Sequence, residues 1–215
     1  MKTGGRFLHP AATFQQHDAG ALSKLIGERG LAIIIAVRDG RPLIAHAPVL
    51  IAAGRLRFHL SRANALVAAL AASRRALAVV TGPDAYISPD WYSAADQVPT
   101  WNYLSAEIEG ATRPLAPAET VDLLDDLSAH FEAKLAPKRP WSRDKLDSDQ
   151  FETLLAAIVG YEMTIERCEG IAKLSQNKPS DEIKRVAGRL AARDDAGSKA
   201  VAHLMALHLT GEKRP

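Results

Sequence analysis

Residues 31–61 read LAIIIAVRDGRPLIAHAPVLIAAGRLRFHLS, and this stretch decides the fold class. Its first seven residues form a continuous apolar run that is too short for a core helix, which predicts a buried strand. Asp39-Gly40 is a hairpin turn signal, and Ala53-Gly54 marks a second turn. The stretch therefore predicts three antiparallel strands in succession: Leu31 to Val37, Pro42 to Ile51 and Arg55 to Ser61.

Three further strands are predicted at Ala76 to Thr81, Trp101 to Gly110 and Ile158 to Cys168. Helices are predicted after Asp18, from about Ala65 to Ala72, from Thr120 to Leu135, and within Asp181 to His208 after a cap at Ser180. Because no regular βαβ rhythm is present, the pattern predicts a mainly β fold, an antiparallel six-stranded barrel with α additions. We expect the barrel and its inserted helices in residues 1–176 and a C-terminal helical extension in residues 177–215.

Composition excludes several classes of protein. The 27 basic and 25 acidic residues are spread along the chain, so no basic block indicates nucleic-acid binding. The single cysteine, Cys168, excludes an intramolecular disulfide and a multi-cysteine zinc site and favours a reducing compartment. The opening MKTGGRFLHP lacks the apolar core of a signal peptide, and the chain has no apolar run of about 18 residues. We therefore expect a cytoplasmic protein that does not enter a membrane.

Metal and catalytic motifs are absent from the sequence. The seven histidines do not form HxH or HExxH patterns, so no metal site is expected. GxSxG, GxGxxG and the P-loop are missing as well. The catalytic residues, if the protein is an enzyme, stay unassigned.

Thr81 to Tyr103, TGPDAYISPDWYSAADQVPTWNY, is a candidate binding surface. It holds five of the chain's twelve aromatic residues among Gly-Pro, Ser-Pro and Val-Pro steps, whereas loops usually carry small polar residues. Its aromatic side chains need something to pack against. That partner is a planar ligand, another subunit or the protein's own core, and the residues leave all three open.

Two polar clusters are further candidates. In FHLSRAN, Phe58 to Asn64, a strand ends in Ser61 and Arg62 before a helix that Asn64 is expected to cap, which is a suitable place for an anion. The alternative is a simple helix cap beside a solvated arginine. KLSQNK, Lys173 to Lys178, is a dense set of hydrogen-bonding side chains after the last strand, and its alternative is a polar turn.

Taken in order, eight motifs closely resemble the PaiB-type family of FMN-binding negative transcriptional regulators. They extend over about 130 residues, and the succession of SP-WY, VPTWNY and KLSQN is highly specific. The N-terminus differs, since members often begin with Met-Tyr-x-Pro. The motifs are AHAPVLI (Ala45 to Ile51), FHLSRAN, TGPDAYISPDWY (Thr81 to Tyr92), VPTWNY (Val98 to Tyr103), HFE (His130 to Glu132), PW (Pro140-Trp141), IVGYE (Ile158 to Glu162) and KLSQNK.

The resemblance implies an FMN-binding split barrel that forms a homodimer with flavin at the subunit interface. It makes the first polar cluster the preferred site of the ribityl phosphate, namely His59, Ser61, Arg62 and Asn64. It gives the aromatic segment the wall of the isoalloxazine ring or the dimer contact, through Pro99, Thr100, Trp101 and Asn102. The second polar cluster would reach the polar edge of the ring or the partner chain, through Lys173, Ser175 and Gln176.

Function stays open between two main classes. The family resemblance implies a repressor, and DNA is a possible partner on that ground alone, because the arginines after Asp181 are balanced by acidic residues and no helix-turn-helix is evident. The alternative is a flavin-dependent oxidoreductase of the pyridoxamine-phosphate-oxidase-like class, in which the cofactor performs the redox step. A weaker third possibility is haem handling, with His46 or His59 as the ligand.

Overall fold

The computed structural model describes residues 8–211. The start of the divergent N-terminus, residues 1–7, lies outside the described residues, so its comparison with the Met-Tyr-x-Pro opening is not tested. Among residues 8–211, no helix has the length and apolar character needed to cross a membrane. The same residues contain no group of three or more His, Cys, Asp or Glu side chains placed to hold a metal ion.

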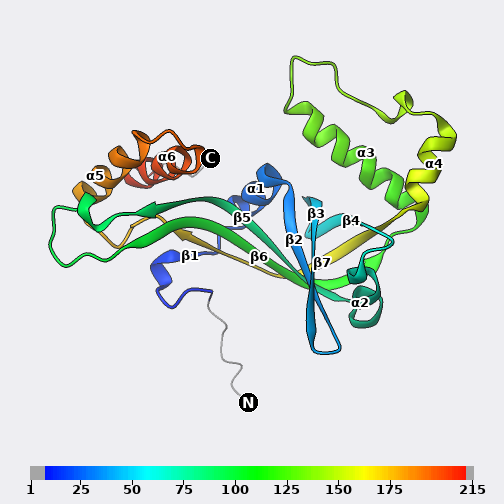
Figure 1. The fold of residues 1–215 in the computed structure, drawn as a ribbon, viewed down its shortest axis with the longest axis horizontal. Coiled ribbons are helices and arrows are strands. Elements are labelled where there is room, and N and C mark those ends of the chain that lie inside the picture. Colours follow the sequence, from blue (N-terminus) through cyan, green and yellow to red (C-terminus); the bar gives the residue numbers. More distant parts are fainter. Residues whose placement is uncertain (1–7, 212–215) are drawn as a thin grey trace. The chain divides into compact units, whose positions relative to one another are not determined.

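Seven strands and six α-helices make up the described chain (Figure 1). The strands are β1 Gln15–Gln16, β2 Leu31–Arg38, β3 Arg41–Ala52, β4 Arg55–Ser61, β5 Arg75–Ile87, β6 Thr100–Pro114 and β7 Ile158–Lys173. The helices are α1 Ala19–Arg29, α2 Ala65–Ser73, α3 Pro117–Ala133, α4 Ser148–Ala156, α5 Ser180–Ala191 and α6 Ala196–Thr210. Short 3-10 turns are η1 Ala12–Phe14, η2 Pro89–Trp91 and η3 Arg143–Lys145.

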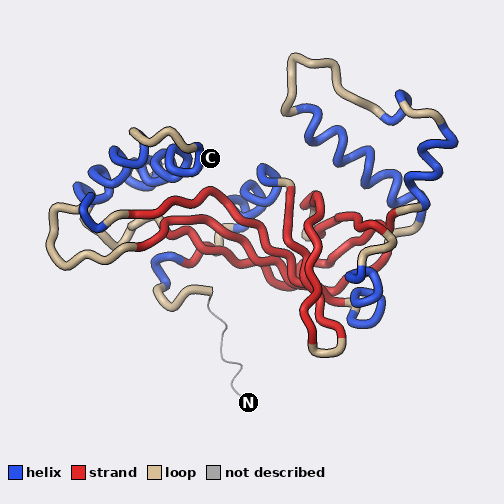
Figure 2. The backbone as a smooth tube through the Cα atoms, viewed as in Figure 1, coloured by secondary structure: helices blue, strands red, loops and turns tan. Residues whose placement is uncertain are grey.

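The chain forms two compact units. Unit 1 contains residues 8–25, 81–106 and 169–211 of the described chain, and unit 2 contains residues 26–80 and 107–168. The long strands β5, β6 and β7, drawn in red with the others in Figure 2, each contribute one part to each unit.

The strands are hydrogen-bonded in the order β1-β7-β4-β3-β2-β5-β6, and β7 also pairs with β6. Strands β2 to β7 therefore form a ring, and the two-residue β1 is an addition to β7. The pairs β2–β3, β3–β4, β2–β5 and β4–β7 are all antiparallel. This arrangement confirms the predicted mainly antiparallel β fold with added helices.

Two tight turns set the register between β2 and β3 and between β3 and β4. Asp39 and Gly40 have φ values of 50° and 72°, and Ala53 and Gly54 have 48° and 72°. Two successive positive φ values are typical of the two-residue hairpin turns that match the twist of antiparallel strands. Both turn predictions are confirmed.

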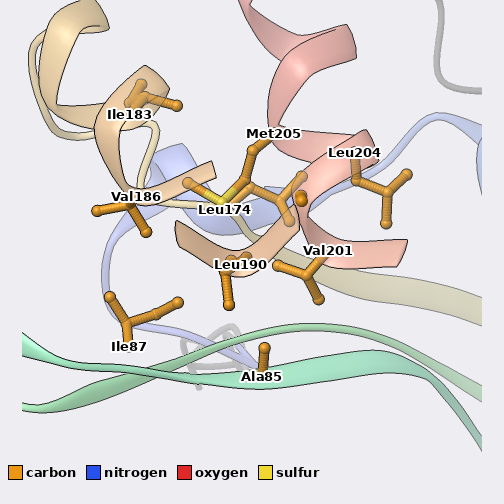
Figure 3. Packing of buried hydrophobic residues seen from close by; sticks show 10 residues of the cluster. Ala85, Ile87, Leu174, Ile183, Val186, Leu190, Val201, Leu204 and Met205 are labelled. Carbon is orange, nitrogen blue, oxygen red and sulfur yellow. The ribbon is translucent and has the colours of Figure 1, made fainter. Parts of the chain in front are cut away.

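Each unit has its own core. In unit 2, Ile34, Leu56 and Phe58 are fully buried, and the Phe58 ring stacks on that of Tyr161 at a centroid distance of 5.4 Å. In unit 1, α5 and α6 bury a cluster of aliphatic side chains against Ala85 and Ile87 of β5 (Figure 3). The helices predicted within residues 181–208 are α5 and α6, and the predicted apolar residues Ile183, Val186 and Leu190 lie in this cluster.

Several predicted boundaries were wrong. β5 continues to Ile87 instead of ending at Thr81, because Ala85 and Ile87 are buried in the core of unit 1 and tertiary packing overrides the Gly-Pro signal. β7 continues to Lys173 for a similar reason, since Ile171 and Ala172 are buried. α4 was not predicted, because it is short and only Phe151 and Leu155 among its nine residues are half-buried, so its apolar side is brief in the sequence.

Candidate functional site

The turn between β4 and α2, in unit 2, contains the first group of predicted site residues. His59 and Ser61 lie on the same face of β4, because side chains two residues apart in a strand point the same way. Asn64 is the N-cap of α2, and its Oδ1 accepts a hydrogen bond from the Leu66 N–H at 2.9 Å. The predicted cap is therefore confirmed.

Arg62 is exposed but firmly held. Its Nε donates to the Ala156 carbonyl and its Nη2 donates to the Ile158 carbonyl, both at 2.9 Å. Both acceptors are neutral carbonyls, and one of them terminates α4, where a cation is favourable. The guanidinium is thus fixed in place without a carboxylate to neutralise its charge among the described residues.

The two arginines of β4, the strand that precedes Arg62, contrast with it. Arg55 pairs with Glu162 at 2.8 Å, and Arg57 pairs with Asp126 at 2.6 Å. Because each is paired with a carboxylate, Arg55 and Arg57 attract an anion less strongly than an unpaired arginine does. Arg62 also lines a cavity of about 430 Å³, which lies among the ends of β6, α3, α4 and β7.

His59 is half-buried, and its Nδ1 is buried without a hydrogen-bond partner among the described residues. Burial lowers the pKa of His59 below the ordinary value of 6.5, because the charged imidazolium loses hydration. The ring is therefore neutral near pH 7. A neutral ring with an unpaired buried nitrogen is suited to a polar neighbour that the chain does not itself provide.

The donors of this turn fit a phosphate in part. The Ala63 N–H donates to Ser61 Oγ at 3.4 Å, the Asn64 N–H donates to the Ser61 carbonyl at 2.9 Å, and Asn64 caps the next turn. The open helix N-terminus expected from the sequence is therefore largely occupied by internal hydrogen bonds. What fits an anion is the pair of side chains Ser61 and Arg62, with a hydroxyl and a fixed guanidinium.

The second group lies in unit 1, where the start of β6 meets the end of β7. Lys173 Nζ donates to the Thr100 hydroxyl and lies 5.9 Å from the centroid of the Phe14 ring. Burial lowers the pKa of the Lys173 ammonium. The structure thus brings together Thr100 and Lys173, which are far apart in the sequence.

Asn102 and Ser175 are buried and bonded to each other. Asn102 Nδ2 donates to Ser175 Oγ at 2.9 Å, and Tyr92 Oη lies 3.2 Å from the same oxygen. Ser175 has a φ of 60°, an uncommon conformation for a residue other than glycine. These three side chains connect the SP-WY, VPTWNY and KLSQNK motifs, and their polar atoms are directed at one another.

The side-chain amide of Gln176 also forms hydrogen bonds within the protein. Its Oε1 accepts from the Leu174 N–H at 2.6 Å, and its Nε2 donates to the carbonyls of Ala172 and Thr13. Within this group, Asn102 and Ser175 are buried, Pro99 and Trp101 are exposed, and Thr100, Lys173 and Gln176 are half-buried.

Trp101 belongs to an exposed aromatic pair. It is 52% exposed and packs edge-on against Tyr86 of β5, which is 46% exposed, at a ring distance of 6.0 Å. Tyr86 was missed as a site candidate, although it lies in the aromatic segment. Glu182 was missed as well: its carboxylate accepts hydrogen bonds from the N–H groups of Ser93 and Ala94. No local signal in the sequence indicates that contact.

Comparisons with known proteins address the family. A family model described as "Putative FMN-binding domain" matches residues 8–167. "Protease synthase and sporulation protein PAI 2" of Bacillus subtilis (strain 168) is 26% identical over 196 residues, which cover 89% of this chain and 93% of that protein. An uncharacterised protein of Emericella nidulans is 30% identical over 152 residues, or 57% of this chain and 61% of that protein.

Solved structures support the fold. The FAD and heme binding protein from Mycobacterium smegmatis has a TM-score of 0.58 at 22% identity, with 79% of this chain and 78% of that chain covered. The flavocytochrome Anf3 from Azotobacter vinelandii has a TM-score of 0.57 at 14% identity, with coverages of 75% and 70%. The split-barrel fold is thereby confirmed. FMN, the cofactor expected from the sequence, is the one for which the matching family is named, and this chain belongs to that FMN-binding domain family.

Proposed function

We propose that the protein binds FMN with the ribityl phosphate at the β4–α2 turn. The carrying observation is Arg62, whose guanidinium is fixed by two backbone carbonyls and is not neutralised by a carboxylate among the described residues. A phosphate dianion beside it would supply the missing counter-charge and accept strong, charge-assisted hydrogen bonds.

The neighbouring residues have separate roles in this proposal. Ser61 donates its hydroxyl to a phosphate oxygen, and Asn64 holds the turn by capping α2. His59, on the same face of β4 as Ser61, packs against the ribityl chain. In unit 1, Trp101 and Lys173 contact either the flavin ring or the partner subunit. The bound FMN supplies redox-active chemistry, and the protein residues bind and orient it.

Titration with FMN and riboflavin tests this assignment, because riboflavin lacks only the phosphate. Wild-type protein is expected to quench FMN fluorescence at low micromolar concentration and to bind riboflavin more weakly. Arg62→Ala is expected to weaken FMN binding by about 1.5–3 kcal/mol, roughly tenfold to a hundredfold, while riboflavin affinity stays unchanged.

Arg55→Ala is the matched control, since Arg55 lies on β4, the strand that leads to Arg62, but is paired with Glu162. It is expected to leave the preference for FMN over riboflavin intact. Equal loss of both ligands in Arg62→Ala would show a folding defect, and an unchanged FMN affinity in a folded Arg62→Ala variant would contradict the phosphate assignment.

We further propose that the protein is a homodimer. An apolar face on the outside of β2, β3 and β5 in unit 2 supports this. Ile35 lies opposite Ile44 of β3 and Leu77 of β5, and Ile33 lies opposite Val79. Leu31, Val37 and Ile44 are 53%, 55% and 58% exposed. A continuous apolar sheet face of this kind is typical of a subunit interface.

For the biological role we propose negative regulation of transcription. The Bacillus subtilis relative, matched over 93% of its length, is named for sporulation and not for a redox reaction. On α5, Arg185 and Arg189 are exposed and Glu182 is buried, while the exposed Lys184 pairs with Asp181 at 3.7 Å. That face is a candidate for contact with DNA phosphates.

Two measurements separate regulation from flavin-dependent oxidation and reduction. A regulator is expected to give a salt-sensitive, sequence-selective gel shift that Arg185→Glu/Arg189→Glu abolishes. An oxidoreductase is expected to bleach its bound flavin with NAD(P)H. Bleaching without any DNA shift would replace the regulatory role by the enzymatic one.

A further inference from the structure

A second cavity in unit 2, of about 260 Å³, lies between α3, α4 and the segment that joins them. Figure 1 shows these two helices and their long connection. Seven of its ten lining residues are apolar: Leu124, Trp141, Leu146, Phe151, Leu154, Leu155 and Ile158. Of these seven, Leu154 is exposed and the others are only half-buried, so their apolar surfaces are not covered by the chain itself.

Trp141 of the PW motif lines this cavity, and Glu132 of the HFE motif holds the Trp141 backbone; the proposed flavin site uses neither residue. Glu132 of HFE accepts a hydrogen bond from the Trp141 N–H of PW at 2.8 Å and also binds Lys138. These two contacts lower the pKa of Glu132, the lysine contact more strongly, so the carboxylate stays charged at neutral pH. The result is a tryptophan held at the cavity wall by its own backbone.

The polar end of the cavity is electrically balanced. Arg143 pairs with Asp125 at 3.1 Å and lies over the Phe151 ring at 5.1 Å. Ser128 donates its hydroxyl to the Leu124 carbonyl of its own helix at 2.8 Å. An ionic ligand would have to break the Arg143–Asp125 pair, whereas a neutral ring meets Trp141 and Phe151 without that cost.

We propose that this cavity binds a small uncharged aromatic molecule, at a site separate from the flavin phosphate site. Its volume supports one or two rings, since a dry cavity of about 150 Å³ already accepts benzene. The proposal does not rest on FMN binding, because none of the residues assigned to FMN lines the cavity.

Indole is the probe that tests the proposal. The side-chain N–H resonance of Trp141, identified by its loss in Trp141→Phe, is expected to shift in a saturable manner as indole is added. Ser128→Met places a larger side chain in the cavity without removing a contact between elements, and it is expected to weaken indole binding at least tenfold.

Ala129→Met is the matched control, because Ala129 is the next residue on α3 but is exposed and does not line the cavity. It is expected to bind indole as the wild type does. Indole-3-acetate, which adds a carboxylate, is expected to bind at least tenfold more weakly than indole.

Several outcomes would overturn the proposal, of which three concern the cavity residues and the ligand. The first is a shift confined to Trp91 or Trp101, the second is full indole binding by Ser128→Met, and the third is binding of indole-3-acetate as tight as that of indole. Loss of binding in Ala129→Met as well would also overturn it, because the effect would then not come from filling the cavity.

Discussion

His59 shows how burial changes the chemistry of a single residue. Its Nδ1 has no hydrogen-bond partner among the described residues, and burial lowers its pKa. The folded protein therefore binds fewer protons at His59 than the unfolded chain does once the pH falls to the ordinary histidine range. By linkage, the free energy of unfolding falls as the pH drops through 6.5 toward the lowered pKa of the folded state.

We expect this loss of stability to be smaller in His59→Phe, which fills the site but cannot be protonated. Urea unfolding of the flavin-free protein between pH 7.5 and pH 5.5 measures it, in a range above the titration of most carboxylates. His203→Phe, on the exposed face of α6, is the control for removal of a histidine. An identical pH dependence in wild type and His59→Phe would contradict the argument.

At the scale of elements, Gly110 allows the ring of strands to close. A Cβ at this position of β6 would lie 1.8 Å from the Thr164 carbonyl oxygen of β7, which is much closer than two non-bonded atoms can approach. A glycine within a strand often marks such a close approach of another backbone. β6–β7 pairing is the contact that completes the ring, so it depends on the missing side chain.

Gly110→Ala is expected to destabilise the protein by about 3 kcal/mol, at the upper end of the range for overpacking, because the obstacle is a backbone atom and cannot rotate away. Gly188→Ala in α5 is the matched control. Nothing lies within 4 Å of its Cβ, so it should stabilise the protein by about 0.5–1 kcal/mol. Opposite signs in denaturant unfolding are the expected result, and a neutral Gly110→Ala would refute the close approach.

At the scale of the whole molecule, the proposed homodimer is supported by the outer face of β2 and β3. Apart from His46, the central outward residues of β2 and β3 are apolar, and burial of Ile44 by a second copy would be favourable. The face is flanked by the exposed Arg38 and Arg41 at the hairpin.

Ile44→Glu is expected to convert a homodimer into a monomer in analytical ultracentrifugation, because two carboxylates would face each other or be buried at a two-fold interface. Leu135→Glu is the control, since Leu135 is 54% exposed but follows α3 and does not belong to the sheet face. A wild-type protein that is monomeric at all concentrations tested would reject the dimer proposal.

Much of the fold could be predicted from local sequence patterns. The hairpins were predicted from the pairs Asp39-Gly40 and Ala53-Gly54 and from the alternation in β4. The start of α2 was predicted from the cap at Asn64. Both predictions succeed because turn and cap geometry depend on adjacent residues. The order of motifs predicted the family. Those patterns did not predict which polar residues would face a ligand.

Asn102, Ser175 and Gln176 illustrate the difference. The family resemblance assigns these three side chains to the flavin ring or to the partner chain. In the fold, Asn102 bonds with Ser175 and Gln176 bonds with the backbone. Arg62, in contrast, is held by backbone carbonyls, and these belong to residues more than ninety positions away. Sequence by itself determined the strands, their turns and the family of this protein. Only the tertiary structure decided which polar groups remain for a ligand, because hydrogen bonds between distant segments determine which donors are already used.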